Sequence, residues 1–350
     1  MIDKYFKMSS GLESFHNLDL AKKCFFSIKQ GELYLEENTI QRVDDKAFFK
    51  KKEVNYLCNW EPSNCYSSEL PTLLICVRDS NLLLKKTTNN IIENEININA
   101  NVVIIDDRPS NQFNYEYVKA LKESNFSYLK ITNKKGFNFS MLNNIAALIC
   151  RKLGCKELVL WNSDLWAAKK GDFEKLLEKH RKEKAAISGA KLLYPPEDIS
   201  LRKEKINSEF GVENKNIRET VQFGGDGWVF SNGGVYPTHL HRFKDKEEHL
   251  VNCDKNVTFV TGAFQIIDLE WFFNTGCMNP SLSKNYQDID LCLKAVFDGR
   301  KVCYFGKDTY LYHDESVTLH KYGKNDGQMV SDFTLFRRIW KKEKLQKLVF

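Results

Sequence analysis

Residues 285–318 carry the side chains whose types and spacing are best suited to chemistry. Two carboxylates, Asp288 and Asp290, open a run with helical period that stops at Gly299. A short β-type run follows, and the segment then reaches His313. Carboxylates at a helix start, with a histidine just beyond the next strand, suit a general base or a divalent-metal site. The residues alone leave a plain alternative open, which is a solvated helix start.

Length and composition exclude several classes of protein. The chain has 350 residues, enough for a large core in one or two domains. Its net charge of +6 arises from 52 basic and 46 acidic residues, which favours an anionic ligand or a membrane surface. The basic residues are spread along the chain, so we expect no nucleic-acid partner. No apolar run approaches the roughly 20 residues of a membrane span, and the start lacks the apolar stretch of a signal peptide, so we expect a cytoplasmic protein.

The cysteine and histidine patterns indicate neither a disulfide scaffold nor a zinc motif. Ten cysteines are scattered without a Cys-x-x-Cys pair, and several lie inside apolar segments, so we expect reduced thiols. Four candidate zinc ligands occur close together, but their spacing matches no zinc motif and we expect loop histidines: His239, His241, His249 and Cys253.

The elements that must position these residues follow from four continuous apolar runs. Helical patterns separate the runs, one of them over residues 138–152. The predicted strands are 72–77, 101–107, 126–131 and 157–161. Apolar strands alternating with helices are typical of a parallel sheet that is covered on both faces. We therefore predict an α/β protein with a Rossmann-like, mostly parallel central sheet and helices on both faces.

Polar side chains follow the predicted strands at their carboxyl ends, where such sheets bind ligands. These residues are Arg78, Asp79, Asp106, Asp107, Asn162 and Asp164. They predict a nucleotide pocket. The sequence lacks a Gly-x-Gly-x-x-Gly or Walker loop, so we expect a divalent metal to neutralise the nucleotide's phosphates. Between Asp106 and Asp107, we expect Asp106 to contact the base or ribose and Asp107 to point the other way.

Several blocks in order over residues 70–318 resemble family 2 inverting glycosyltransferases, which have the GT-A fold. The blocks are "VRDS" with "VVIIDD", "GFNFSMLNN", "LWNSDLW", "ISGAKLLYPP" with "VQFGGDGWVF", and the segment from "VTFVTGAF" to "YQDIDLCLKA" with the later "HDES". The block "GFNFSMLNN" is similar to one in a rhamnosyltransferase-like subset. The Gln-x-x-Arg-Trp signature of processive synthases is absent, so we do not expect a polymer-extruding enzyme.

The resemblance implies a sugar transfer from a UDP-, GDP- or dTDP-linked donor to a hydroxyl of a glycan or other acceptor. It implies that Asp288 is the general base and that Asp164 and His313 hold Mn²⁺ or Mg²⁺ against the donor diphosphate. The donor-binding residues would be Arg78, Asp79, Asp106, Asp107, Asn138 and Asn162. The acceptor-binding residues would be Thr261, Gly262, Trp271 and Asp290. The transferred group would be a hexose or deoxyhexose.

One departure from the family pattern supports an alternative function. Asn162 stands where the first acid of the Asp-x-Asp motif is expected, which favours a catalytically inactive nucleotide-sugar or glycan-binding module. Turnover distinguishes the two functions, because an inactive module binds nucleotide without releasing nucleoside diphosphate.

The predicted organisation has three parts. Residues 1–69 form an N-terminal appendage of unknown role, and residues 70–320 form the GT-A domain. That domain divides into a nucleotide-binding half, 70–166, and an acceptor half, 167–320. Residues 321–350 form a basic helical tail, for which we expect a packed helix, with contact to a membrane surface as the alternative.

Overall fold

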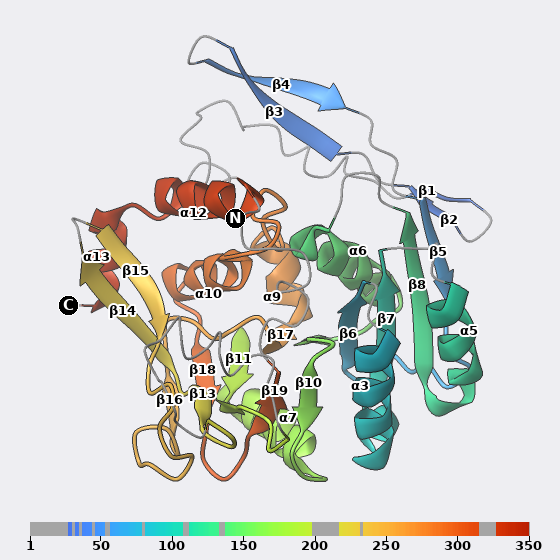
Figure 1. Cartoon of the computed structure of the whole chain (residues 1–350). Helices are drawn as coiled ribbons and strands as arrows, with labels where there is room; N and C mark the ends of the chain where they lie inside the picture. The colour runs from blue at the N-terminus through green and yellow to red at the C-terminus, as the bar shows by residue number, and fades with distance from the viewer. Residues whose placement is uncertain are drawn as a thin grey trace.

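The computed structural model describes residues 27–29, 32–34, 37–43, 46–52, 57–78, 81–107, 112–132, 137–197, 217–231, 234–314 and 327–349. An eleven-stranded sheet runs through these residues in the order β1-β2-β5-β8-β7-β6-β9-β17-β11-β18-β16. Helices pack along it, as Figure 1 shows. The predicted α/β fold is confirmed. Asp79 and the "ES" of the "HDES" block lie outside the described residues.

The centre of the sheet, β8-β7-β6-β9, is parallel, as the apolar runs predict. Its strands are β6 (Thr72–Val77), β7 (Asn101–Asp106), β8 (Phe126–Thr132) and β9 (Glu157–Trp161). All six residues of β7 are buried, which explains why its sequence is apolar without alternation. The connecting helices are α3 (Asn81–Glu93), the short α4 (Ile96–Asn99), α5 (Gln112–Ala120), the 3₁₀ turn η1 (Lys122–Ser124) and α6 (Phe139–Lys152).

The second half of the sheet is mixed. Strand β17 (Phe264–Asp268) runs antiparallel to both β9 and β11 (Ile187–Ala190). Strand β18 (Val302–Phe305) is parallel to β11, and β16 (Asp254–Asn256) closes this edge antiparallel to β18. An apolar run predicts that a strand is buried but does not predict its direction. The antiparallel pairs could therefore not be predicted from the sequence pattern.

A four-stranded sheet brings distant segments of the chain to one edge of this fold. Its order is β10-β19-β12-β13, formed by β10 (Leu165–Ala167), β19 (Leu311–His313), β12 (Leu192–Leu193) and β13 (Val221–Phe223). A hairpin of β14 (Asp226–Ser231) and β15 (Gly234–His239) follows β13. Three further helices are α7 (Asp172–Glu183), α9 (Leu269–Asn274) and α10 (Gln287–Phe297).

The N-terminal stretch contributes strands of its own. Strand β5 (Leu57–Glu61) pairs antiparallel with β8, so the end of the stretch predicted as an appendage extends the central sheet. Strands β1 (Ser27–Lys29) and β2 (Glu32–Tyr34) continue that edge, and β3 (Glu37–Val43) pairs with β4 (Lys46–Lys52) in a separate hairpin.

The C-terminal tail packs against the protein through its apolar side. It forms α12 (Gly327–Ile339) and α13 (Lys342–Val349), which lie beside α10 and the β14–β15 hairpin in Figure 1. Four tail side chains join Val235, Leu282 and Leu293 in one buried cluster: Phe336, Ile339, Trp340 and Leu345. Within the described part of the chain, none of the helices combines the length and apolarity that crossing a membrane requires.

Candidate active site

Asp164 and His313 meet although they are far apart in the sequence. The β10–β19 ladder pairs Leu165 with His313, and the backbone N–H of Asp314 donates to the carbonyl of Asp164 across 2.9 Å. Oδ1 of Asp164 lies 3.2 Å from Nε2 of His313, and both side chains are less than one-tenth exposed. The ladder therefore builds the pair that the resemblance assigns to metal binding.

Gln222 orients the ring of His313. Its side-chain oxygen, on β13, lies 3.0 Å from Nδ1 of His313. A proton on Nδ1 donates to this amide oxygen, and in the neutral ring that leaves the lone pair on Nε2, the nitrogen that faces Asp164. A histidine held through its other nitrogen and facing a carboxylate oxygen is the arrangement of a metal ligand.

The donor set fits a metal ion that is shared with a substrate. Among the described residues, no group of three or more His, Cys, Asp or Glu side chains could hold a metal ion. Mg²⁺ in phosphate-transfer sites commonly takes one or two carboxylates and fills its other positions with substrate phosphates and water, so Asp164 fits as the carboxylate and His313 would add a nitrogen ligand.

Asp288 is held by backbone groups at the start of α10. Gly262 N–H donates to its Oδ2 across 2.6 Å, and Ile289 N–H donates to its Oδ1 across 2.9 Å. Removal from water raises the pKa of the Asp288 carboxyl, and the two backbone hydrogen bonds partly offset this by stabilising its charge. A fixed carboxylate with a raised pKa is suited to accept a proton.

The loop that holds Asp288 is joined to the turn that carries Asp164. The carbonyl of Ala263, next to Gly262, accepts a hydrogen bond from the backbone N–H of Asn162 at 3.0 Å. Asn162 in turn opens the turn between β9 and β10, where its carbonyl accepts from Leu165 N–H at 3.1 Å. The candidate base and the candidate metal pair therefore sit on adjoining segments.

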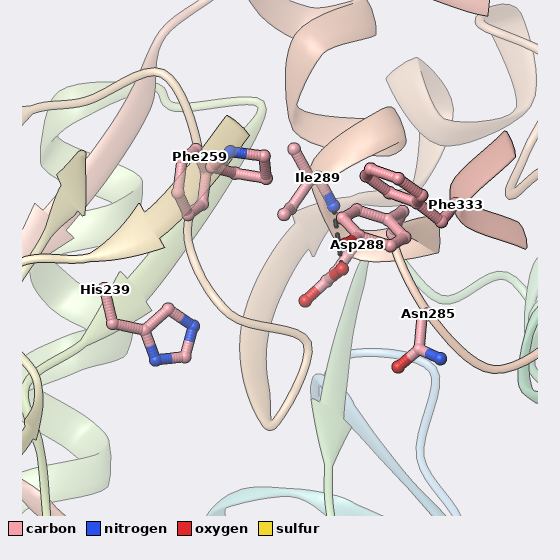
Figure 2. Close-up of a pocket in the computed structure, with 8 residues that line it drawn as sticks. His239, Phe259, Asn285, Asp288, Ile289 and Phe333 are labelled. Carbon is pink, nitrogen blue, oxygen red and sulfur yellow. Dashed lines mark hydrogen bonds between the residues drawn. The ribbon is translucent and has the colours of Figure 1, made fainter. Parts of the chain in front are cut away.

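A pocket of 320 Å³ opens beside Asp288. Figure 2 shows Asp288 between His239 and Asn285, with the Phe333 ring above it. The remaining lining residues are Pro237, Phe259, Tyr286 and Ile289. This volume is within the range of small-molecule pockets.

A second group of buried polar atoms lies at the ends of β6 and β7. Nη1 of Arg78 is 3.7 Å from Oδ2 of Asp107. Within the described part of the chain, Nε of Arg78 and Oδ1 of Asp107 are buried and have no hydrogen-bond partner. Burial raises the pKa of Asp107 to about 6, with Arg78 opposing the shift and Asp106 adding to it. Unsatisfied polar atoms in a crevice indicate a site for a polar ligand.

Asp106, the carboxylate expected to contact the nucleoside, already accepts a hydrogen bond within the protein, whereas Asp107 has an oxygen without a partner. Asp106 is fully buried, and its Oδ2 accepts a hydrogen bond from the hydroxyl of Tyr128 at 2.7 Å. Asp107 retains an unsatisfied oxygen, because strand alternation turns it toward Arg78. Of the two carboxylates, Asp107 therefore offers the oxygen that is open to a further hydrogen bond.

Two residues from the predicted binding set hold elements together. Asn138 caps α6, since its Oδ1 accepts from Met141 N–H at 2.9 Å while its Nδ2 donates to the carbonyl of Pro280. Trp271, on α9, is 5% exposed and packs in the main hydrophobic core. Neither residue lines the pocket beside Asp288.

The predicted acceptor residues Thr261, Gly262 and Asp290 differ in their surroundings. Thr261 is half-buried in the loop before β17, and Gly262 donates to Asp288 as described. Asp290 is fully buried, with Oδ1 accepting from Trp340 Nε1 at 2.9 Å and Oδ2 lying 3.5 Å from Lys294 Nζ. Its carboxylate thus joins α10 to the tail and has no exposed surface for an acceptor.

Sequence reasoning missed several residues of the site. Gln222 lay in a block taken only as a linking strand, and Phe333 lay in a tail whose pattern indicated packing. His239 was expected in a surface loop, but it ends β15 and lines the pocket. The block "NYQDID" gave a signal for Asn285 and Tyr286, because they lie three and two residues before Asp288.

Comparison with known proteins supports the fold. The chain matches no family model and no curated protein. A crystal structure of GalNAc-T7 with UDP, GalNAc and Mn²⁺ resembles it at a TM-score of 0.54 and 14% identity, covering 79% of this chain and 49% of that one. This chain therefore spans about half the length of GalNAc-T7 in that structure. S. aureus TarS 1-349 is similar at a TM-score of 0.43 and 11% identity, over 70% of this chain and 60% of that one. The likeness to GalNAc-T7 confirms the predicted GT-A fold.

Proposed function

We propose that this chain is a glycosyltransferase, which moves a hexose or deoxyhexose from a nucleotide-sugar donor to an acceptor hydroxyl. One observation carries the proposal. Asp288, at the start of α10, is fixed beside a pocket by Gly262 and Ile289, and the loop that carries Gly262 is joined to the turn that carries Asp164. The GT-A fold, shared with a protein crystallised with UDP and Mn²⁺, supports a nucleotide-sugar donor.

Asp288 is the general base in this proposal. The acceptor oxygen attacks the anomeric carbon as the bond from that carbon to the diphosphate breaks, and Asp288 takes the hydroxyl proton. A single displacement of this kind inverts the anomeric configuration. A positioned base contributes roughly 10²–10⁴-fold to such a rate.

Asp164 and His313 are the proposed ligands of Mn²⁺ or Mg²⁺. A bound divalent ion would neutralise charge on the departing diphosphate. Gln222 orients His313 for this role through Nδ1. Asn162, in the same turn as Asp164, is neutral, so it adds a dipole rather than a charge to the site.

The nucleoside is proposed to lie at the ends of β6 and β7. The unsatisfied Oδ1 of Asp107 can accept from a base N–H or a ribose hydroxyl, and Arg78 balances its charge. Asp79 belongs to this proposal through the sequence pattern alone.

Some details of the proposal depend on the sequence resemblance alone. Membership of family 2, the rhamnosyltransferase-like subset and the inverting outcome follow from the "GFNFSMLNN" and "QDID" blocks. A cytoplasmic location, with contact to a membrane surface as the alternative, is proposed from the sequence pattern rather than from the resemblance.

A donor screen tests the proposal. The full chain is incubated with Mn²⁺ and UDP-, GDP- or dTDP-sugars, and release of nucleoside diphosphate is measured with and without simple glycosides. We expect release from one donor class, and a loss of release in Asp288→Asn. Nucleotide binding without release from any donor would instead support the inactive binding module that Asn162 suggests.

A further inference from the structure

The loop that leads into α10 is held by elements that are distant from it in the sequence. From the side of α6, Phe139 N–H donates to the carbonyl of Ser283 across 2.8 Å, and Asn138 Nδ2 donates to the carbonyl of Pro280 across 2.9 Å. From the other side, α12 approaches the same loop, since it lies beside α10 (Figure 1). The place where α10 begins, and with it Asp288, therefore depends on two other helices.

Asp332 makes the contact between α12 and this loop. Its Oδ2 accepts a hydrogen bond from Lys284 N–H at 2.8 Å and a second from Asn285 N–H at 3.1 Å. The Asp332 side chain is fully buried. Hydrogen bonds from backbone N–H groups to a carboxylate are charge-assisted and roughly twice as strong as neutral ones. Asp332 therefore anchors the backbone of the loop three residues before Asp288.

Tyr286, between this anchor and Asp288, has a backbone conformation that requires support. Its φ of 63° lies in the left-handed region, which residues other than glycine seldom adopt. Its carbonyl accepts a hydrogen bond of the first turn of α10 from Asp290 N–H at 2.8 Å. Its ring contacts two rings of α12, Phe336 at 4.9 Å and Phe333 at 5.7 Å between centroids. Strained backbone persists where its surroundings enforce it, and α12 supplies such contacts.

Asp332 is not among the residues that line the pocket beside Asp288, although its partner Asn285 lines it. Any effect of Asp332 on the reaction must therefore pass through the loop. Because α10 follows the loop directly, a shift of the loop backbone moves Asp288, whose carboxylate is aligned with Gly262 N–H across 2.6 Å. A displacement of about 1 Å can cost 10²-fold in rate. The anchor is thus close enough in the chain to control the position of the candidate base.

We propose that Asp332 is a positioning residue for the sugar transfer, because its two backbone hydrogen bonds fix the loop that places the general base Asp288. This inference rests on the proposed function, to which it adds a residue from the C-terminal tail. Asp332 acts through the backbone of Lys284 and Asn285 and takes no part in the proton transfer. Helix α12 thereby contributes to the rate of the reaction as well as to the packing of the tail.

Steady-state kinetics of nucleoside-diphosphate release test the proposal, on the full chain with Mn²⁺ and the best donor. Asp332→Leu is similar in size but accepts no hydrogen bond, so it should lower kcat by about tenfold or more. The donor KM and the nucleotide Kd should stay within about threefold, because the proposed nucleoside site lies at the ends of β6 and β7. Asp332→Asn keeps an oxygen for the two N–H groups and should restore most of kcat. An unchanged kcat in Asp332→Leu, or a loss confined to KM, overturns the proposal.

Leu345→Ala separates positioning from a general loss of stability. Leu345, on α13, is buried in the apolar cluster that holds the tail against the protein, so its truncation should lower the Tm. At a temperature well below unfolding, this variant should keep the wild-type kcat, because the bonds of Asp332 to the loop remain. If Leu345→Ala loses as much kcat as Asp332→Leu, the effect comes from the tail as a whole, and the proposal is wrong.

Amide hydrogen exchange gives a readout that does not depend on turnover. Local opening of the loop exposes its amides, so exchange over residues 284–289 should be about tenfold faster or more in Asp332→Leu than in wild type, and unchanged in Leu345→Ala. Faster exchange with a wild-type kcat, or unchanged exchange with a reduced kcat, contradicts the link between loop and base. If the wild-type chain releases no nucleoside diphosphate from any donor, the proposed function fails, and the exchange then decides alone whether Asp332 anchors the loop.

Discussion

Gly262 approaches Asp288 so closely that only a glycine fits there without a shift. Its N–H donates to Oδ2 of Asp288 across 2.6 Å, and a Cβ at position 262 would lie 2.9 Å from Cβ of Asp288. Real Cβ atoms essentially never approach other atoms that closely. The loop before β17 therefore sets the position of the candidate base.

Gly262→Ala should therefore displace the carboxylate and lower the rate of nucleoside-diphosphate release at least tenfold. A displacement of about 1 Å can cost 10²-fold in rate. Nucleotide affinity should be unchanged, since Gly262 contacts Asp288 and not the β6–β7 edge. Thr261→Ser, which keeps the neighbouring hydroxyl, is the control. Wild-type turnover in Gly262→Ala would show that the position of Asp288 is not critical.

The Asp164–His313 pair predicts that nucleotide binding requires a divalent ion. UDP, GDP or dTDP should bind with Mn²⁺, and at least tenfold more weakly in excess EDTA. Asp164→Ala should abolish the difference between the two conditions, because it removes the carboxylate ligand. Gln222→Leu should reduce the difference partially, since second-shell partners typically contribute 10–100-fold to metal affinity. Equal affinity with and without metal in the wild-type chain would contradict the metal site and leave Asp164 and His313 as a buried structural pair.

Asp107 predicts a pH-dependent stability. Its pKa is raised from 3.8 to about 6, so the folded state binds the proton more tightly than the unfolded state. The stabilisation from the neutral form is complete below pH 3.8 and is lost as the pH rises through about 6. Relative to wild type, Asp107→Asn should therefore gain up to about 3 kcal/mol in free energy of unfolding between pH 4 and pH 8, as measured by urea titration.

The control for Asp107 is the exposed Glu116 on α5, where Glu116→Gln should show no such trend. In the same samples, Asp107→Ala should weaken nucleoside-diphosphate binding by more than about 1 kcal/mol, the contribution of a typical hydrogen bond. If the difference in unfolding free energy between Asp107→Asn and wild type does not change with pH, Asp107 does not set the pH dependence of stability. If Asp107→Ala also binds nucleotide as wild type does, Asp107 does not contact the nucleoside.

We predict that Asp290 contributes to the free energy of unfolding of the protein. Asp290→Ala leaves the fully buried Lys294 without its carboxylate partner, and breaking a buried pair typically costs about 3–5 kcal/mol. The double variant Asp290→Leu/Lys294→Met should recover most of this loss, because it removes both charges. Urea unfolding measures both variants. Normal stability combined with a raised KM for acceptor would instead support the acceptor role that the resemblance implies.

The sequence predicted the parts of the fold that depend on local pattern. Strands β6 and β7 are continuous apolar runs, and the break after each places Arg78 and Asp107 at the carboxyl ends of these parallel strands. The helix start at Asp288 was predictable for the same reason, because Gln287–Phe297 keeps a helical period up to the Gly299 stop. In each case the residue pattern that predicts the strand or helix lies within one short segment.

Features that depend on long-range pairing could not be predicted from local pattern. Strands β10 and β19 have three residues each, too few to show a period, so the pairing of Asp164 with His313 was expected only through the resemblance and the ladder that builds it was not predicted. Trp271 illustrates the converse, since an aromatic residue in an acceptor-like block packs in the core. Phe333 was missed because a helical pattern does not show which ring of the helix reaches a pocket.

The most direct test of the account is the turnover of Asp288→Asn beside wild type, measured as nucleoside-diphosphate release from the best donor. The account predicts a fall of about 10²–10⁴-fold at unchanged nucleotide affinity, because the amide cannot take up the acceptor proton. Wild-type turnover should rise with pH as Asp288 ionises, with a midpoint above the ordinary 3.8, since burial raises its pKa. Asp298→Asn, at the other end of α10, is the control and should keep wild-type turnover. Near-normal release from Asp288→Asn would contradict the account.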